Sequence, residues 1–236
     1  MRRPALDGFT IFGHRGAAGS APENTLAGFD AALGHGARWI ELDVQAHPEA
    51  LIVFHDDRLE RRTDGSGALL ETPLAALRAL DAGDGTAIPT LEEVLDHLRG
   101  RAALNIELKG GRAVGERTAA ALDAALAGGW RAADLLVSSF DHAALAAFRA
   151  ALPQVPVAPL FAEDAGPAIA TAQRFDTDVV HLARDLATAE MMAALDAAGL
   201  RAHVYTVNDP EEAERLRKLG AAGIFTDHPG RFMLHT

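Results

Sequence analysis

The chain has 236 residues, of which 49% are hydrophobic and 23% are charged, a balance typical of a globular protein with one large core. A formal net charge of -11 without any basic run argues against nucleic-acid binding, and the absence of cysteine excludes disulfides and thiolate metal ligands. Because no apolar run approaches the ~20 residues that span a bilayer, we expect a single cytoplasmic domain over residues 1–236 without a membrane span. Whether it forms a homo-oligomer stays open.

Short runs with the character of β-strands recur along the chain and are mostly separated by alanine- and leucine-rich stretches with helical spacing. This alternation predicts β/α units around a parallel sheet. Eight such units close into a barrel, so the expected fold class is α/β, a (β/α)8 TIM barrel. The expected strands are residues 10–13, 39–44, 104–108, 135–139, 157–161, 179–182, 202–207 and 223–226.

Helix start and stop signals fit between these strands. Thr90 followed by Glu93 is a capping box, and Asp209 followed by a proline begins another helix. Gly220 is placed to end that second helix in a left-handed conformation, and Gly34 is expected to end an earlier one.

One further run, residues 51–54, follows the second barrel strand after a connection too short for a crossover helix. We expect it to fold back as a β-hairpin. Residues from about 57 to 89 then form a short excursion between barrel strands 2 and 3. A tight return pairs residues whose numbers sum to about 96, which places His55 beside Glu41.

Carboxylates occur with a period of two on two of the predicted strands. Glu41 and Asp43 point to the same face of one strand, and Glu107 lies on another. Three oxygen ligands suit one hard divalent cation, Mg²⁺ or Ca²⁺, better than zinc. A solvated strand end for the first two acids, or a simple neighbour pair of Glu107 with Lys109, are the alternatives.

Two histidines are candidates for proton transfer. His14 and Arg15 follow the first strand, where barrel enzymes place their chemistry, and Arg15 offers a planar fork of donors to a phosphate. His14 and His55 together can supply an acid and a base. Taken alone, the pair formed by His55 and Asp56 is more often a surface turn. His181 and His203 can face either the site or the barrel wall. Solvent exposure is expected for the others, His35, His47, His97, His142, His228 and His235.

The ordered motifs of the chain resemble the glycerophosphodiester phosphodiesterase family over nearly the full length, and most closely its bacterial cytoplasmic members. The resemblance implies the family's barrel and its reaction on a small-molecule substrate. That reaction is hydrolysis of glycerophosphodiesters, such as glycerophosphocholine or glycerophosphoethanolamine, to an alcohol and glycerol 3-phosphate. The motifs are GHRG at 13–16, APENT at 21–25, IELDV at 40–44, HDDRLERRTDG at 55–65, IPTLEEVL at 88–95, NIELK at 105–109, SSFD at 138–141, VYTVND at 204–209 and FTD at 225–227.

Carried over residue by residue, the resemblance implies a role for each candidate. The metal ligands are Glu41, Asp43 and Glu107, with Glu23 as a further contact to the metal or to a bound water. His14 and His55 are the acid and the base, Arg15 and Lys109 hold the phosphate oxygens, and Phe140 and Tyr205 wall the glycerol side. Tyr205 stands where many relatives carry tryptophan, which leaves the glycerol contact open, and the turn at 45–50 lacks the Lys-Asp-Gly common in the family.

Two other functions are open at this stage. One is a lysophospholipase D-like or phosphoinositide-type phosphodiesterase on the same barrel, against which the lack of an apolar loop counts. The other is a non-catalytic barrel that binds a phosphorylated ligand, against which the presence of every ionisable group counts. The sequence does not decide the alcohol, the metal, the first nucleophile or which histidine is the acid.

Overall fold

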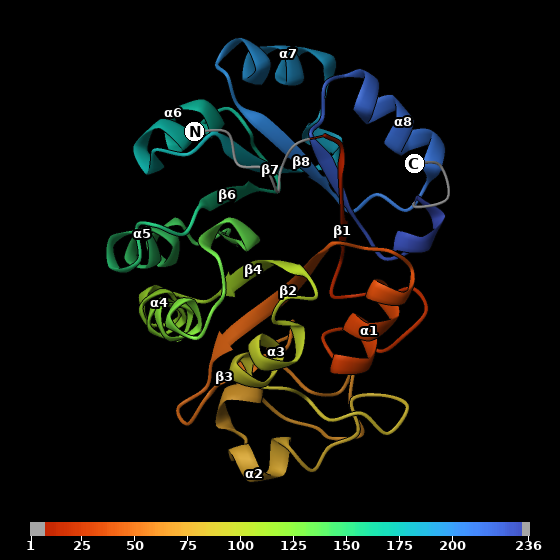
Figure 1. Cartoon of the computed structure of the whole chain (residues 1–236), viewed down its shortest axis with the longest axis vertical. Coiled ribbons are helices and arrows are strands. Elements are labelled where there is room, and N and C mark those ends of the chain that lie inside the picture. Colours follow the sequence, from red (N-terminus) through yellow and green to blue (C-terminus); the bar gives the residue numbers. More distant parts are fainter. Residues whose placement is uncertain (1–7, 233–236) are drawn as a thin grey trace.

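The computed structural model describes residues 8–232, and its strands close into a ring of eight parallel members. The predicted TIM barrel is therefore confirmed (Figure 1). Pairing of β1 with β2 closes the ring, and four of the strands have the predicted bounds. In ring order the strands are β1 (Thr10–Gly13), β2 (Trp39–Ala46), β4 (Ala103–Lys109), β5 (Leu135–Ser139), β6 (Val157–Phe161), β7 (Val179–Ala183), β8 (Arg201–Tyr205) and β9 (Gly223–Thr226).

Helices surround the ring and connect consecutive strands (Figure 1). They are α1 (Leu26–Gly34), α3 (Leu91–Leu98), α4 (Arg112–Ala127), α5 (His142–Ala151), α6 (Ala168–Phe175), α7 (Ala189–Ala197) and α8 (Pro210–Lys218). Short 3-10 turns cover Leu69–Glu71, Ala132–Asp134, Arg184–Leu186 and Pro229–Arg231. Within residues 8–232 there is no helix with the length and apolar character that crossing a membrane requires.

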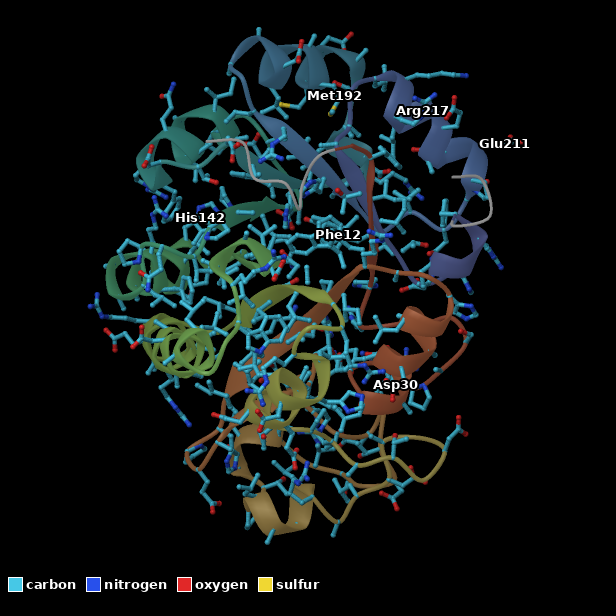
Figure 2. The ribbon with its side chains drawn as sticks, in the orientation of Figure 1. Phe12, Asp30, His142, Met192, Glu211 and Arg217 are labelled. Atoms are coloured by element: carbon cyan, nitrogen blue, oxygen red, sulfur yellow. The ribbon has the colours of Figure 1, made fainter. Side chains whose placement is uncertain are left out.

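The interior of the barrel is filled by aromatic rings. Phe12, which Figure 2 shows in the middle of the ring, stacks on Phe225 at a centroid distance of 4.5 Å and lies 5.3 Å from Trp39. His181 and His203 belong to the same interior, are fully buried, and approach each other to 3.3 Å between Nε2 and Nδ1. These two histidines therefore face inward, which the sequence had left open.

The hairpin is confirmed as an antiparallel strand outside the ring, β3 (Leu51–Val53), paired with β2. The excursion that follows contains α2 (Leu74–Leu77) and lies at the lower end of the molecule in Figure 1. It has a small core of its own, made by Ile52, Phe54, Leu59, Leu69, Leu77, Ala82 and Ile88. This segment therefore packs as an apolar lobe beside the barrel.

The helix signals are confirmed. Both bonds of the Thr90–Glu93 capping box are present, Asp209 caps α8, and Gly220 follows that helix with a φ of 92°. Gly34 is the last residue of α1, as expected, and a left-handed glycine, Gly36, follows two residues later. The helix continues to Gly34 because the His35 N–H still bonds back to the carbonyl of Ala31.

Two expectations need correction. His47 is buried, because the excursion folds over the hairpin turn and the Thr72 carbonyl accepts a 2.9 Å hydrogen bond from His47 Nε2. The seventh barrel strand, β8, ends at Tyr205, two residues earlier than expected, although the N–H of Val207 still bonds Phe225 O. His235 lies outside the described residues.

Candidate active site

The barrel strands end at one face, where a cavity of about 160 Å³ collects eight of the nine predicted site residues. Its lining includes His14, Arg15, Glu41, His55, Glu107, Lys109, Phe140 and Tyr205. The ninth residue, Asp43, is buried next to it, 3.4 Å from Lys109 Nζ. The residues named from the sequence therefore come together at one place, and the contacts among them indicate what each side chain can do.

Three acids form one cluster at the base of this cavity. Glu41, Asp43 and Glu107 each offer an oxygen within 4.8 Å of the others, because β2 and β4 are neighbours and pair Asp43 with Glu107. Glu41 and Asp43 are buried, which rules out the solvated strand end. Glu41 Oε1 has no hydrogen-bond partner among the described residues. Three close carboxylates, one with an unsatisfied oxygen, fit a hard divalent cation.

The acids differ in how strongly they hold a proton. Burial, together with the charge of Asp43, raises the pKa of Glu41 and of Glu107. Burial acts the same way on Asp43, but Lys109 and Arg15 outweigh it and lower the Asp43 pKa. The protein cations therefore neutralise one acid well and leave the other two under-compensated, which a bound cation would correct.

Arg15 is aimed at the cluster by a strained turn. Its φ of 51° is left-handed, and the following Gly16 is required because a Cβ there would lie 2.6 Å from the Gly28 carbonyl oxygen. The Arg15 backbone N–H donates to Glu41 Oε2 at 2.8 Å, and its Nη1 donates to Glu23 Oε1 at 2.9 Å. Main chain and guanidinium of one residue thus hold two different acids.

Glu23 lies outside the group of three clustered acids, so its predicted contact to a metal or a bound water stays a prediction. Its carboxylate is instead shared by three arginines, Arg15, Arg61 and Arg62, with ion-pair distances of 2.9, 2.9 and 2.7 Å. These bonds outweigh burial and lower the Glu23 pKa. Its role is to hold arginines in place.

His14 is oriented by an acid that directly follows the neighbouring strand, β9. Its Nδ1 donates to Asp227 Oδ1 at 2.7 Å, and Asn208 Nδ2 donates to the other Asp227 oxygen at 2.6 Å. His14 Nε2 therefore faces the cavity, 4.0 Å from Glu41 Oε2. Burial opposes a charge on the ring, but Asp227 and Glu41 outweigh it and raise the His14 pKa.

His55 reaches the cavity by a different route from the one predicted. The hairpin pairs have numbers that sum to 97, as in Val44 with Val53, so a continued ladder would set His55 opposite Leu42. The ladder ends at Val53 instead, and the buried Gln45 Nε2 donates to the carbonyls of Phe54 and Asp56. This bend, rather than strand pairing, brings His55 into the cavity that Glu41 also lines.

The His55 ring also donates its Nδ1 proton to an acid. The acceptor is Asp56 Oδ1 at 2.6 Å, and both Asp56 oxygens are bonded by Arg61. Burial dominates at His55 and lowers its pKa. Both candidate histidines thus donate Nδ1 to an aspartate, but the pKa of His14 is raised and that of His55 is lowered.

Phe140 and Tyr205 form the apolar side of the cavity. Their rings meet edge to face at 5.8 Å, and Lys109 Nζ lies 5.9 Å from the Phe140 centroid. The Tyr205 hydroxyl donates to Phe161 O at 2.7 Å, so it is turned away from a free role as an acid. Burial also raises the pKa of the Tyr205 hydroxyl, which likewise makes it a poor acid.

Sequence reasoning gave no role to three polar residues that support the site: Asp56, Asn24 and Asp227. Asn24 Nδ2 donates a hydrogen bond to Asp43 Oδ2 at 2.9 Å, and the backbone N–H of Asp43 donates one to Asn24 Oδ1 at 3.2 Å. A signal for Asp227 was present, because it directly follows β9 as His14 follows β1, and these strands are neighbours. The other two, Asn24 and Asp56, lie in loops, where strand periodicity has no meaning.

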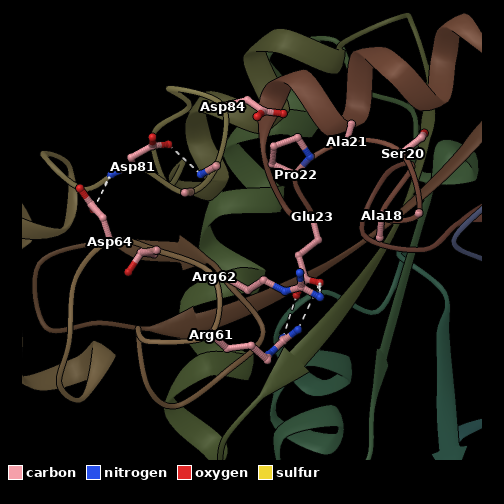
Figure 3. Close-up of a pocket in the computed structure, with 14 residues that line it drawn as sticks. Ala18, Ser20, Ala21, Pro22, Glu23, Arg61, Arg62, Asp64, Asp81 and Asp84 are labelled. Atoms are coloured by element: carbon pink, nitrogen blue, oxygen red, sulfur yellow. Dashed lines mark hydrogen bonds and ion pairs between the residues drawn. The ribbon is translucent and has the colours of Figure 1, made fainter.

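A wider hollow of about 710 Å³ lies between the loop before α1 and the excursion (Figure 3). Glu23, Arg61 and Arg62 form one side of it, and Asp64, Asp81 and Asp84 lie elsewhere on its lining. It does not contain the paired histidines or the acid cluster. The smaller cavity is therefore the candidate active site, and Glu23 of the wider hollow bonds Arg15, which lines the smaller cavity.

Comparisons with known proteins agree with this assignment. The family model described as the glycerophosphoryl diester phosphodiesterase family matches residues 14–231. YhdW of Bacillus subtilis is 35% identical over 233 residues, 93% of this chain and 94% of YhdW. The glycerophosphodiester phosphodiesterase of Bacillus altitudinis is 32% identical over 236 residues, 94% of this chain and 95% of the relative.

A solved structure extends the match to three dimensions. An Oleispira antarctica phosphodiesterase, solved in complex with the product sn-glycerol-3-phosphate, superposes with a TM-score of 0.89 at 31% identity, covering 97% of this chain and 98% of the other. Fold, cavity and sequence thus point the same way. The chain belongs to the glycerophosphoryl diester phosphodiesterase family and is an enzyme, a phosphodiesterase that hydrolyses glycerophosphodiesters.

Proposed function

We propose that the chain is a single catalytic domain over residues 1–236 that hydrolyses glycerophosphodiesters such as glycerophosphocholine or glycerophosphoethanolamine in a metal-dependent reaction. The products are an alcohol and glycerol 3-phosphate. The supporting observation is one cavity that combines three clustered carboxylates, two histidines and two cations. The product complex of the Oleispira antarctica relative supports a small-molecule substrate here.

Glu41, Asp43 and Glu107 would hold one divalent cation, Mg²⁺ or Ca²⁺. Their oxygens lie close enough to share an ion, and the unpartnered Glu41 Oε1 fits a ligand role. Carboxylates without cysteine or histidine in the set favour these hard ions. When bound, the cation would polarise the phosphodiester and offset its charge.

Arg15 and Lys109 would bind the remaining phosphate oxygens. Both contact Asp43, at 3.3 Å from Arg15 Nε and 3.4 Å from Lys109 Nζ, so both cations lie at the edge of the acid cluster. Placed there, they can stabilise the charge that develops as the phosphorus–oxygen bond to the alcohol breaks. Phe140 and Tyr205 would pack against the glycerol carbons.

His14 and His55 would divide the proton transfers. One takes the proton of the attacking oxygen, and the other gives a proton to the departing alcohol oxygen. Each Nδ1 is occupied by an aspartate, which leaves Nε2 as the nitrogen for this exchange. In this arrangement the neutral form of each ring would carry its proton on Nδ1, so that Nε2 can accept a proton.

Metal removal tests the proposal directly. Hydrolysis of glycerophosphocholine, followed as release of glycerol 3-phosphate, is expected to fall to background in excess chelator and to return with Mg²⁺ or Ca²⁺. The His14→Ala and His55→Ala variants should each lose at least about 100-fold in kcat. Full activity in chelator would refute the metal role, and wild-type rates in both variants would refute the histidine roles.

A further inference from the structure

Arg15 and His55 are held by acids that do not belong to the cluster of Glu41, Asp43 and Glu107. Arg15 Nη1 donates to Glu23 at 2.9 Å, and His55 Nδ1 donates to Asp56 at 2.6 Å. Glu23 comes from the loop before α1, whereas Asp56 follows β3. The phosphate-binding side and the proton-transfer side of the cavity are thus supported from two separate segments.

One residue of the excursion contacts both of these acids. Arg61 Nη2 lies 2.7 Å from Asp56 Oδ1 and 2.9 Å from Glu23 Oε1, and Arg61 Nε also bonds Asp56. Figure 3 shows the Arg61 side chain directed at Glu23. A planar guanidinium can bond a carboxylate along one edge and still reach a second acceptor, which an ammonium holds less rigidly.

We propose that Arg61 is a positioning residue that keeps His55 and Arg15 in working geometry at the same time, through Asp56 and Glu23. This inference rests on the proposed function, because it concerns residues of that site. It assigns the excursion a part in the reaction in addition to its own packing. Arg61 itself is 43% exposed and does not line the catalytic cavity, so it acts through its partners.

The two connections are unequal in strength. If Arg61 is removed, Glu23 still has Arg15 at 2.9 Å and Arg62 at 2.7 Å. The Asp56 carboxylate would retain, among residues 8–232, only its bond to His55. Loss of Arg61 should therefore disturb His55 more than Arg15, and lower kcat more than it raises KM.

The next residue provides a matched control. Arg62 carries the same charge, is 45% exposed, and contacts Glu23 but not Asp56 in the described part of the chain. Arg61→Met and Arg62→Met therefore remove equal charge at nearly the same place. We expect Arg61→Met to lower kcat on glycerophosphocholine by about 10- to 100-fold. Arg62→Met should change kcat by less than about 3-fold.

A double-mutant cycle tests whether Arg61 acts through His55. In a His55→Ala background, Arg61→Met should reduce kcat much less than it does in wild type, because the ring that it positions is gone and only the weaker connection to Arg15 through Glu23 remains. A full additive loss would overturn the proposal. Equal kcat values for Arg61→Met and Arg62→Met would overturn it as well.

A measurement independent of activity separates this proposal from the proposed function. Long-range ¹⁵N NMR reports the tautomer of each histidine ring, and the His55 signals are those missing in His55→Ala. Arg61→Met should shift these signals toward a tautomer mixture, and Arg62→Met should not. Unshifted signals refute positioning even if catalysis is metal-dependent, whereas shifted signals support it even if His55→Ala stays active.

Arg61→Lys covers the case in which Arg61→Met does not fold, judged by its thermal midpoint. Lysine keeps the charge but lacks the planar fork, so kcat should stay at least about 5-fold below wild type. Wild-type kcat for Arg61→Lys would mean that only charge matters at this position and would overturn the positioning role.

Discussion

His14 and His55 come from different loops, yet each is held in the same way. An aspartate accepts the Nδ1 proton, and that aspartate is itself fixed, by Asn208 in one case and by Arg61 in the other. An imidazole held on one nitrogen has a single tautomer, which leaves the second nitrogen for chemistry. The aspartates therefore matter to the site although they do not line its cavity.

Asp227→Asn tests this arrangement for His14. An amide at this position can donate a hydrogen bond to Nδ1 and so favour the wrong tautomer, which should lower kcat by about 100-fold or more with little change in KM. Steady-state kinetics on glycerophosphocholine measure both constants. Asp185→Asn, at an exposed aspartate, serves as control and should behave as wild type. Unchanged kcat for Asp227→Asn would contradict the role.

At the scale of elements, the hairpin of β2 and β3 is held by side-chain hydrogen bonds as well as by strand pairing. The buried amide of Gln45 donates to two backbone carbonyls in the segment that follows β3, Phe54 O at 3.0 Å and Asp56 O at 2.9 Å. A side chain on β2 thereby shapes the bend on which His55 sits. Stability and site geometry are coupled at this one residue.

Gln45→Met should therefore affect both properties. Two carbonyls lose a buried donor, which is expected to lower the free energy of unfolding by about 1–3 kcal/mol and to reduce kcat as His55 shifts. Thr90→Ala is the control, because loss of the α3 capping box should cost about 1 kcal/mol without changing kcat. Denaturant unfolding and kinetics measure the two effects. A destabilised Gln45→Met enzyme with wild-type kcat would exclude the coupling to His55.

At the scale of the whole molecule, the barrel interior contains ionisable groups that have to stay neutral. Burial lowers the His203 pKa to about 3, an effect that the nearby charge of Arg201 increases and Asp178 opposes. Burial also puts the His181 pKa well below its usual value, with His203 as the second cause. In the unfolded chain both rings regain a pKa near 6.5. The folded state therefore binds fewer protons than the unfolded state below that pH.

The contribution of these two histidines to stability should accordingly fall as the pH drops below about 6.5, since the unfolded state is favoured wherever it binds more protons. Each neutral histidine would cost about 2 kcal/mol at pH 5 relative to pH 7. His203→Asn should flatten this dependence by one such contribution, measured as the free energy of unfolding by denaturant from pH 7 to pH 5. Identical pH dependence in both proteins would show that His203 is not kept neutral.

Most of the fold was predictable because its signals are local. Short β-like runs separated by stretches with helical spacing predicted all eight barrel strands, and Thr90 with Glu93 and Asp209 predicted the beginnings of two helices. Errors arose where distant segments act on local ones. His47 is buried by the excursion, and the hairpin ladder is one residue out of the expected register.

The acid cluster was predictable for the same reason, since alternation on a strand sets the face of Glu41, Asp43 and Glu107. The sequence alone therefore determined the barrel and the identity of its acids. Only the tertiary structure decided that Asp227 orients His14, that Glu23 holds arginines, and that Arg61 links it to Asp56. These partners lie in loops, and a loop's conformation depends on long-range packing and hydrogen bonds that no periodicity encodes.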